Sequence, residues 1–177
     1  MKKLMALVLS AMFLLSTVGI ALAADQTITG NPAEAIAVTA PANKAAWAFA
    51  IGNNDYTPLT TNRLLVQSNV IYNVKVNADT ATNKTTAPMT QYDGVSAYVV
   101  SGKVMQSAPK IIVDAAETAV TLTAANVTGL TSKAATVDAG SYHDLTIRQT
   151  VGYGDAKLTT TGHVYRVVLT WTAVATP

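Results

Sequence analysis

From residue 24 onward, the sequence is a succession of short runs in which apolar and polar residues alternate between turn-forming residues. Alternation with a period of two is typical of strands, and many short strands between turn signals are typical of sandwiches and barrels. No convincing helical period follows Ile20. The pattern therefore predicts an all-β fold, a single antiparallel β-sandwich of Greek-key or jelly-roll type.

The run from Val164 to Val174 is the longest, and a strand so apolar is expected to be central or covered, because a long apolar edge invites pairing with another chain. Residues 52–55, Gly-Asn-Asn-Asp, are expected to form a turn, and Asp93-Gly94 a hairpin-type turn. Residues 79–88 and most of 126–140 are expected to be loops. The expected strands are Gln26–Thr29, Ala35–Ala40, Ala45–Ile51, Arg63–Ser68, Val70–Asn77, Val95–Val100, Lys103–Gln106, Ile111–Val113, Ala119–Thr123, Tyr142–Val151 and Val164–Val174.

The first twenty-three residues have the layout of a secretory signal peptide. Lys2 and Lys3 precede an apolar run, and Ala21-Leu22-Ala23 supplies the small residues that signal peptidase requires. We expect cleavage after Ala23, with an uncleaved membrane anchor as the alternative, because the run is just short of the roughly 18–20 apolar residues of a span. The expected organisation is a signal peptide at 1–23, an extended arm or first strands at 24–40, and a β-sandwich at 41–177.

Composition indicates a protein with few electrostatic partners. The chain has no cysteine, so packing and backbone pairing must stabilise it without disulfides. Without Lys2 and Lys3, ten basic residues balance ten acidic ones, and charged residues make up only 12% of the chain, against about 25% in typical domains. This predicts no nucleic-acid partner, and contact with the membrane only through the signal peptide during export. A neutral, threonine-rich surface suits a subunit that assembles with its own copies or with other envelope proteins.

No group of residues has the spacing of a catalytic or metal site. Ser141-Tyr142-His143-Asp144 contains the residue types of a nucleophilic triad, but Ser141 and His143 would share one face of a strand and Asp144 the other. His143 and His163 are the only histidines and lack a zinc-site spacing. We therefore predict a protein that is not an enzyme, with no catalytic residue, no metal ligand and no cofactor. Calcium stays open, because the turns at 53–55, Asp79 and Asp93 are rich in oxygen ligands.

Exposed tyrosines are the candidate ligand-binding residues. Aromatic platforms bind carbohydrate, and Tyr56, Tyr92 and Tyr153 are the candidates here; half-buried strand-end packing is the alternative. Asn83 and Asn126 lie in N-glycosylation sequences, Asn-Lys-Thr and Asn-Val-Thr.

The segment 24–40 is a candidate assembly strand. It is nearly uncharged, and Ile36 and Val38 alternate with small residues. An extended segment of this kind can add to the sheet of a neighbouring subunit through main-chain hydrogen bonds. Pairing within its own domain as the first strand is the alternative.

Part of the sequence resembles small secreted β-sandwich proteins of prokaryotic envelopes. Residues 64–69, Leu-Leu-Val-Gln-Ser-Asn, followed by Tyr-Asn-Val-Lys-Val at 72–76, look like their V-x-S-N…W/Y-x-V-x-V hairpin. Asp93-Gly94 and the closing run at 165–172 fit the same order, which is similar to WxL-type surface domains and to uncharacterised secreted proteins of methanogenic archaea. The resemblance implies a non-enzymatic envelope protein. The Trp-x-Leu signature itself is absent, because the two tryptophans stand in Trp47-Ala48-Phe49 and Trp171-Thr172-Ala173.

The leading interpretation is a secreted structural protein of the cell surface or extracellular space, a self-assembling fibre or envelope-layer subunit that uses β-strand addition. The alternative is a β-sandwich module that binds carbohydrate or another envelope component.

Overall fold

The structure is a computed structural model that describes residues 32–44, 47–58, 63–122 and 127–176. The chain divides into two compact units, Met1–Pro32 and Ala33–Pro177, and the described residues belong almost entirely to the second. The predicted signal peptide and the predicted strand Gln26–Thr29 lie outside the described residues. No helix occurs in the described ranges, so none of their segments is a helix long and apolar enough to cross a membrane.

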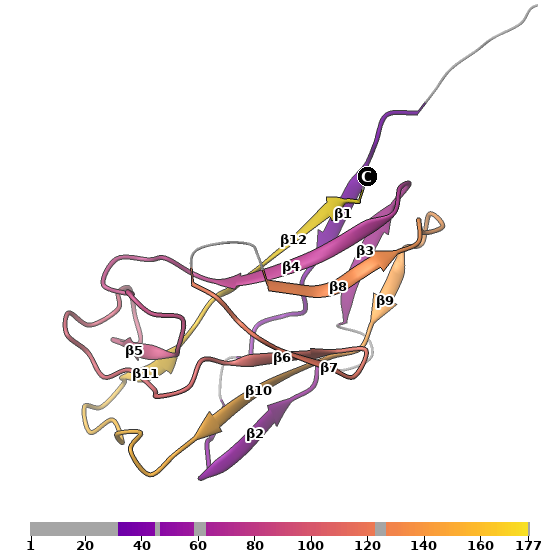
Figure 1. Cartoon of the computed structure of the whole chain (residues 1–177). Coiled ribbons are helices and arrows are strands. Elements are labelled where there is room, and N and C mark those ends of the chain that lie inside the picture. Colours follow the sequence, from indigo (N-terminus) through magenta and orange to yellow (C-terminus); the bar gives the residue numbers. More distant parts are fainter. Residues whose placement is uncertain (1–31, 45–46, 59–62, 123–126, 177) are drawn as a thin grey trace, which may run out of the picture. The chain divides into compact units, whose positions relative to one another are not determined.

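All regular elements of the described residues are β-strands (Figure 1). They form four sheets, in the orders β1-β3-β9, β2-β10-β6-β7, β11-β5 and β12-β4-β8. Every pairing within these sheets is antiparallel, which confirms the predicted all-β, antiparallel class. The strands are β1 (Ile36–Thr39), β2 (Gly52–Tyr56), β3 (Leu64–Ser68), β4 (Tyr72–Ala78), β5 (Thr90–Tyr92), β6 (Lys110–Val113), β7 (Ala116–Ala119), β8 (Val127–Lys133), β9 (Ser141–His143), β10 (Leu145–Val151), β11 (Val164–Arg166) and β12 (Leu169–Ala175).

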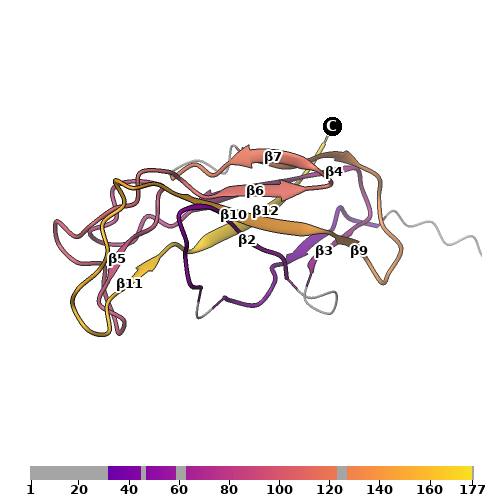
Figure 2. The ribbon, with the colours of Figure 1, turned by 90° about the horizontal axis from the view of Figure 1, so that it is seen from below.

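The inward face of β4 forms the centre of the core. Its alternation, which the sequence predicts, buries Tyr72, Val74, Val76 and Ala78 almost completely. Figures 1 and 2 show β4 with β12 and β8 in one sheet and β6 and β10 in another. Burying each Val, Leu or Ile side chain contributes about 1.5–3 kcal/mol, so this cluster supplies the packing that a chain without disulfides needs. The residues that complete it are Leu64, Val66, Ile111, Val113, Val120, Val127, Leu130 and Leu145.

The prediction of a strand at 45–51 followed by a turn at 52–55 is wrong. Trp47–Ile51 is outside any strand, and Gly52–Tyr56 forms β2, which pairs with β10. β2 is an edge strand, and its polar side chains are accommodated because Asp55 and Asn53 hydrogen-bond to side chains of the neighbouring β10. Arg148 donates from Nε and Nη2 to the two carboxylate oxygens of Asp55 at 2.7 and 2.8 Å, and Thr150 donates to Asn53 Oδ1 at 2.7 Å.

The terminal run, predicted as one strand, is two strands in two sheets. β11 pairs with β5, and β12 pairs with β4. The break falls at Val168, whose backbone exchanges two hydrogen bonds with Asp79: Val168 N–H donates to Asp79 Oδ1 at 3.0 Å, and Asp79 N–H donates to the Val168 carbonyl at 2.8 Å. Of the two expected positions, central or covered, the central one is wrong, since β12 is the edge of its sheet. β1, from another sheet, contacts β12.

Other boundaries differ in smaller ways. Residues 127–133, predicted to be mostly loop, form the seven-residue β8. The predicted strands 95–100 and 103–106 contribute only isolated bridges, Tyr98 with Tyr92 and Val104 with Thr90. The predicted strand 119–123 is replaced by β7, and 142–151 is divided into β9 and β10 at Asp144. Residues 95–106 form no regular strand, and several of their backbone hydrogen bonds, such as Val99 N–H to the Gln91 carbonyl and Gly102 N–H to the Val99 carbonyl, lie in turns and loops.

The predicted turn at Asp93-Gly94 is confirmed. Asp93 N–H donates to the Ala97 carbonyl at 3.0 Å, and Gly94 has a φ of 84°, the left-handed region that favours glycine. Asp93 Oδ1 accepts the backbone N–H groups of Val95, Ser96 and Ala97 at 2.8, 2.8 and 3.0 Å. These three hydrogen bonds stabilise the carboxylate and lower the pKa of Asp93 to about 2.

Candidate functional site

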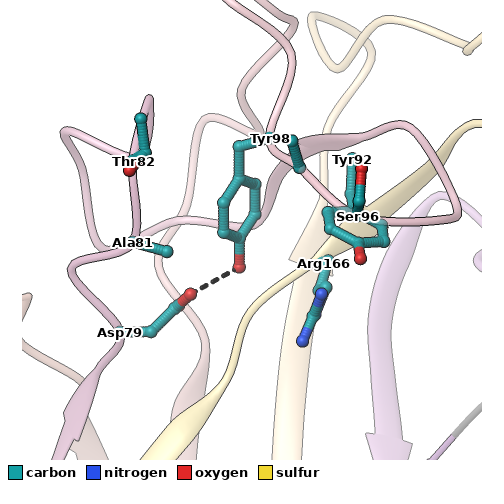
Figure 3. A pocket seen from close by; sticks show the side chains of 8 residues that line it. Asp79, Ala81, Thr82, Tyr92, Ser96, Tyr98 and Arg166 are labelled. Atoms are coloured by element: carbon teal, nitrogen blue, oxygen red, sulfur yellow. Dashed lines mark hydrogen bonds between the residues drawn. The ribbon is translucent and has the colours of Figure 1, made fainter.

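Two features of the described residues are candidates for function: a pocket beside β5 and β11, and the packing of β1 against β3. The pocket has a volume of about 350 Å³ (Figure 3), within the range of about 300–1,000 Å³ typical of small-ligand sites. Its lining residues come from the loop after β4, the end of β5, the loop that follows it, and β11. They are Asp79, Ala81, Thr82, Tyr92, Ser96, Ala97, Tyr98 and Arg166.

Asp79 is the central hydrogen-bond acceptor of this pocket. Tyr98 donates its hydroxyl to Asp79 Oδ2 at 2.7 Å, shown as the dashed line in Figure 3. Asp79 Oδ1 accepts the Val168 N–H and lies 3.9 Å from Lys84 Nζ. The carboxylate therefore connects the loop after β4 to the loop after β5 and to the link between β11 and β12.

Lys84 is a buried cation behind this wall, and its side chain is fully inaccessible to solvent. Its ammonium group donates to the carbonyls of Thr86 at 2.6 Å and Pro88 at 3.0 Å, besides pairing with Asp79. Burial lowers the pKa of Lys84, and the charge of Asp79 opposes that shift. Because a buried charge needs partners, the polar loop 79–88 is folded around this ammonium group.

Two tyrosines and Arg166 form the other side of the pocket. The rings of Tyr92 and Tyr98 meet edge to face with centroids 5.6 Å apart, and Arg166 Cζ lies 4.3 Å from the centre of the Tyr92 ring. Burial and the hydrogen bond to Asp79 raise the pKa of Tyr98, so its phenol remains a donor at neutral pH. The Asp93 turn carries Ser96 and Ala97 into the same wall.

β1 pairs with β3 of the same chain. The register joins Ile36 to Ser68 and Val38 to Val66, and Ile36 and Val38 pack against the core, where Leu64 and Val66 are fully buried. Asn69 holds the start of the strand: its Oδ1 accepts Ala35 N–H at 2.8 Å, and its Nδ2 donates to the Ala33 carbonyl at 2.8 Å. Both candidate assembly residues therefore lie at a sheet edge within one compact unit.

The three candidate tyrosines are not in one platform. Tyr56 lies on β2, with its ring 6.1 Å from that of Trp47 and with Lys44 Nζ 5.5 Å from its centre. Tyr92 lines the pocket, whereas Tyr153 is 94% exposed in the turn after β10. Of the candidate glycosylation sites, Asn83 is exposed but donates Nδ2 to the Tyr98 carbonyl at 3.1 Å, and Asn126 lies outside the described residues.

The polar partners of His143 are Tyr72 and Asp114, rather than its sequence neighbours Ser141 and Asp144. Its Nε2 is 3.0 Å from the Tyr72 hydroxyl, and its Nδ1 is 3.7 Å from Asp114 Oδ2. Asp144 instead lies 3.3 Å from the Nε of Arg63. His163 Nδ1 is 2.7 Å from Gln91 Nε2. In the described ranges, no three His, Cys, Asp or Glu side chains form a group able to hold a metal ion.

Sequence reasoning missed Thr82 and Arg166 as pocket residues and Lys84 as the buried cation behind Asp79. A lysine in a polar loop gives no signal of burial, and Arg166 falls in a run that the pattern predicts as one long strand. From the sequence, Asp79 is only an oxygen-rich loop residue, because its partners Tyr98 and Val168 are distant in sequence.

The fold and the pocket define an antiparallel all-β protein with a small polar and aromatic site. In comparisons with known proteins, no family model, no curated protein and no solved structure matches this chain.

Proposed function

We propose that this chain is a secreted, non-enzymatic structural protein of the cell surface or extracellular space. In this proposal it is a single antiparallel β-sandwich after cleavage of a signal peptide, and it assembles into fibres or an envelope layer by exchanging its first strand between copies. The observation that carries the proposal is the position of β1, a four-residue strand at a sheet edge whose Ile36 and Val38 pack against the buried core.

Exchange of β1 requires no new contact. The β1 strand of a second copy would meet the same backbone groups of β3 and the same apolar side chains that it meets in its own chain, which is why swapping a terminal element is a low-cost route to oligomers. Residues 40–51 separate β1 from β2, and twelve extended residues span about 40 Å. That reach suffices for an arm to bridge two copies.

The edges and the surface charge also favour association. β12, seven residues long, has β4 as its only neighbour in its sheet among the described strands. Sparse charge and a balanced net charge after residue 23 give little repulsion between copies. The resemblance to small envelope β-sandwich proteins supports the same assignment.

A pair of engineered cysteines tests the exchange directly, because the chain has no cysteine of its own. Ala37 and Gln67 are exposed and directly opposite in the β1–β3 register, where Cα atoms about 5.5 Å apart suit a disulfide. We expect the double variant Ala37→Cys/Gln67→Cys, oxidised after assembly, to give covalent ladders on non-reducing gels.

The matched control is Asn53→Cys/Thr150→Cys, a directly opposite pair on β2 and β10. We expect this pair to form only intramolecular bonds, so that it runs as a monomer. Assemblies in which the 37–67 disulfide also stays within single chains would show that β1 docks in its own subunit and would overturn the exchange mechanism.

A further inference from the structure

Arg166 is a half-buried cation in the pocket wall. Within the part of the chain that the structure describes, its guanidinium forms no ion pair with a carboxylate, and its contact is the face of the Tyr92 ring, 4.3 Å away. A guanidinium stacked on an aromatic ring keeps its five N–H donors in the plane of the group, free for an acceptor approaching from the edge.

The other charges of the pocket compensate one another. Asp79 is paired with Lys84 and also accepts hydrogen bonds from Tyr98 and Val168. Asp79 and Lys84 together are neutral, so Arg166 gives the lining residues one positive charge, and the Asp93 carboxylate lies behind them on Ser96 and Ala97. The site is therefore suited to a singly charged anion, while the nearby Asp79 carboxylate disfavours a doubly charged phosphate or sulfate.

The remaining lining groups suit a sugar ring. Thr82 and Ser96 are exposed and carry hydroxyls; that of Ser96 donates to Asp93 Oδ2 at 3.2 Å and can accept from a ligand, and an Asp79 oxygen has lone pairs for a further donor. In Figure 3 the ring of Tyr98, which is 3% exposed, lies between the side with Ala81 and Thr82 and the side with Tyr92, Ser96 and Arg166. Tyr98 is thus a buried wall of the pocket, and a pyranose that enters the pocket can direct one substituent to Arg166 and its hydroxyls to the polar rim.

We propose that the pocket binds a uronic acid unit of an acidic polysaccharide, with the sugar carboxylate paired to Arg166 in bidentate geometry. Tyr92 fixes the plane of the guanidinium, and the Asp79–Tyr98 hydrogen bond fixes the floor. That a polysaccharide is the source of the carboxylate rests on the proposed extracellular location. The pocket and the β1 edge involve different residues, so binding and assembly are separable.

The test is titration calorimetry of the purified protein with oligogalacturonate and with oligoglucuronate. We expect one of these to bind and its methyl ester, which has the same rings without the charge, to bind at least about tenfold more weakly. Arg166→Gln should weaken binding by a similar factor, and Arg166→Lys should restore only part of it, because lysine keeps the charge but not the fork.

Two further variants separate binding from folding. Arg63→Gln removes an arginine outside the pocket, paired with Asp144, and should bind like the parent. Thr82→Val keeps the shape of an exposed side chain and should weaken binding severalfold with an unchanged melting temperature.

Several outcomes would overturn the proposal: no binding of either uronate, equal binding of the ester, or full binding by folded Arg166→Gln. Sulfate as tight as the uronate would mean a plain anion site, and binding only of a poly-glutamate peptide would mean a protein partner. A monomer that binds uronate would contradict strand exchange alone, whereas filaments that bind none would contradict the pocket assignment alone.

Discussion

At the residue scale, His143 shows how burial sets the charge state of a side chain. It is 8% exposed, its Nε2 lies 3.0 Å from the Tyr72 hydroxyl, and its Nδ1 lies 3.7 Å from Asp114 Oδ2. Burial lowers the pKa of His143, and it outweighs the attraction of Asp114, which acts in the opposite direction. The imidazole is thus held neutral in the folded protein.

This predicts a loss of stability in mild acid. The folded pKa of His143 lies below the ordinary value of about 6.5, so below that pH the unfolded chain binds more protons than the folded one. The free energy of unfolding should be constant above pH 7 and fall as the pH drops from about 6.5 towards the folded pKa. Urea denaturation at pH 7.5, 6.5 and 5.5 measures this change in the free energy of unfolding.

His143→Gln should flatten this dependence, while His163→Gln, which changes a half-buried histidine paired with Gln91, should keep it. An equal slope in the parent and in His143→Gln would contradict the assignment.

At the element scale, side-chain alternation predicts the buried strands, whereas the polar ones depend on partners distant in sequence. The inward faces of β4 and the start of β10 follow their apolar residues. The sequence pattern does not predict β2, because its Gly-Asn-Asn-Asp residues form a strand through their pairing with β10. It does not predict the full length of β8 either, because Gly129, which Ile111 contacts closely, interrupts the apolar alternation. The break at Val168 depends on Asp79, eighty-nine residues earlier.

The pocket was predictable only in part for the same reason. Tyr92 was a candidate from its residue type, but nothing local indicates that Arg166 stacks on it or that Lys84 is buried behind Asp79. Each depends on a loop meeting a strand from elsewhere in the chain.

The turn beside the pocket gives a prediction at this scale. A Cβ at Gly94 would meet the backbone carbonyl oxygen of Gly162, and Gly94 has a φ of 84°. Gly162 has nearly the same φ, 82°, but a Cβ there meets nothing within 4 Å. Placing alanine in the left-handed region therefore costs roughly 1–2 kcal/mol in both Gly→Ala variants. Only Gly94→Ala adds a clash between the new Cβ and the backbone.

We expect Gly94→Ala to lower the free energy of unfolding clearly more than Gly162→Ala, measured by urea denaturation at one pH. Equal losses would mean that the two loops are not in contact as described.

At the scale of the whole molecule, a terminal strand at a sheet edge, sparse charge and the predicted signal peptide support the proposal that this chain is a subunit. Ile36 and Val38 of β1 pack against the core of their own chain, and in the proposed exchange the same residues of a neighbour take their place. The Arg166 pocket lies on other elements, β5 and β11 with their loops, so an assembled layer would keep it available for polysaccharide.

The most direct measurement is the mass in solution of the protein without its predicted signal peptide, by size-exclusion chromatography with light scattering, followed by negative-stain electron microscopy of the same sample. The account predicts large regular oligomers or filaments whose mass is a multiple of that of residues 24–177. A homogeneous monomer of that mass, unchanged on concentration, would contradict it.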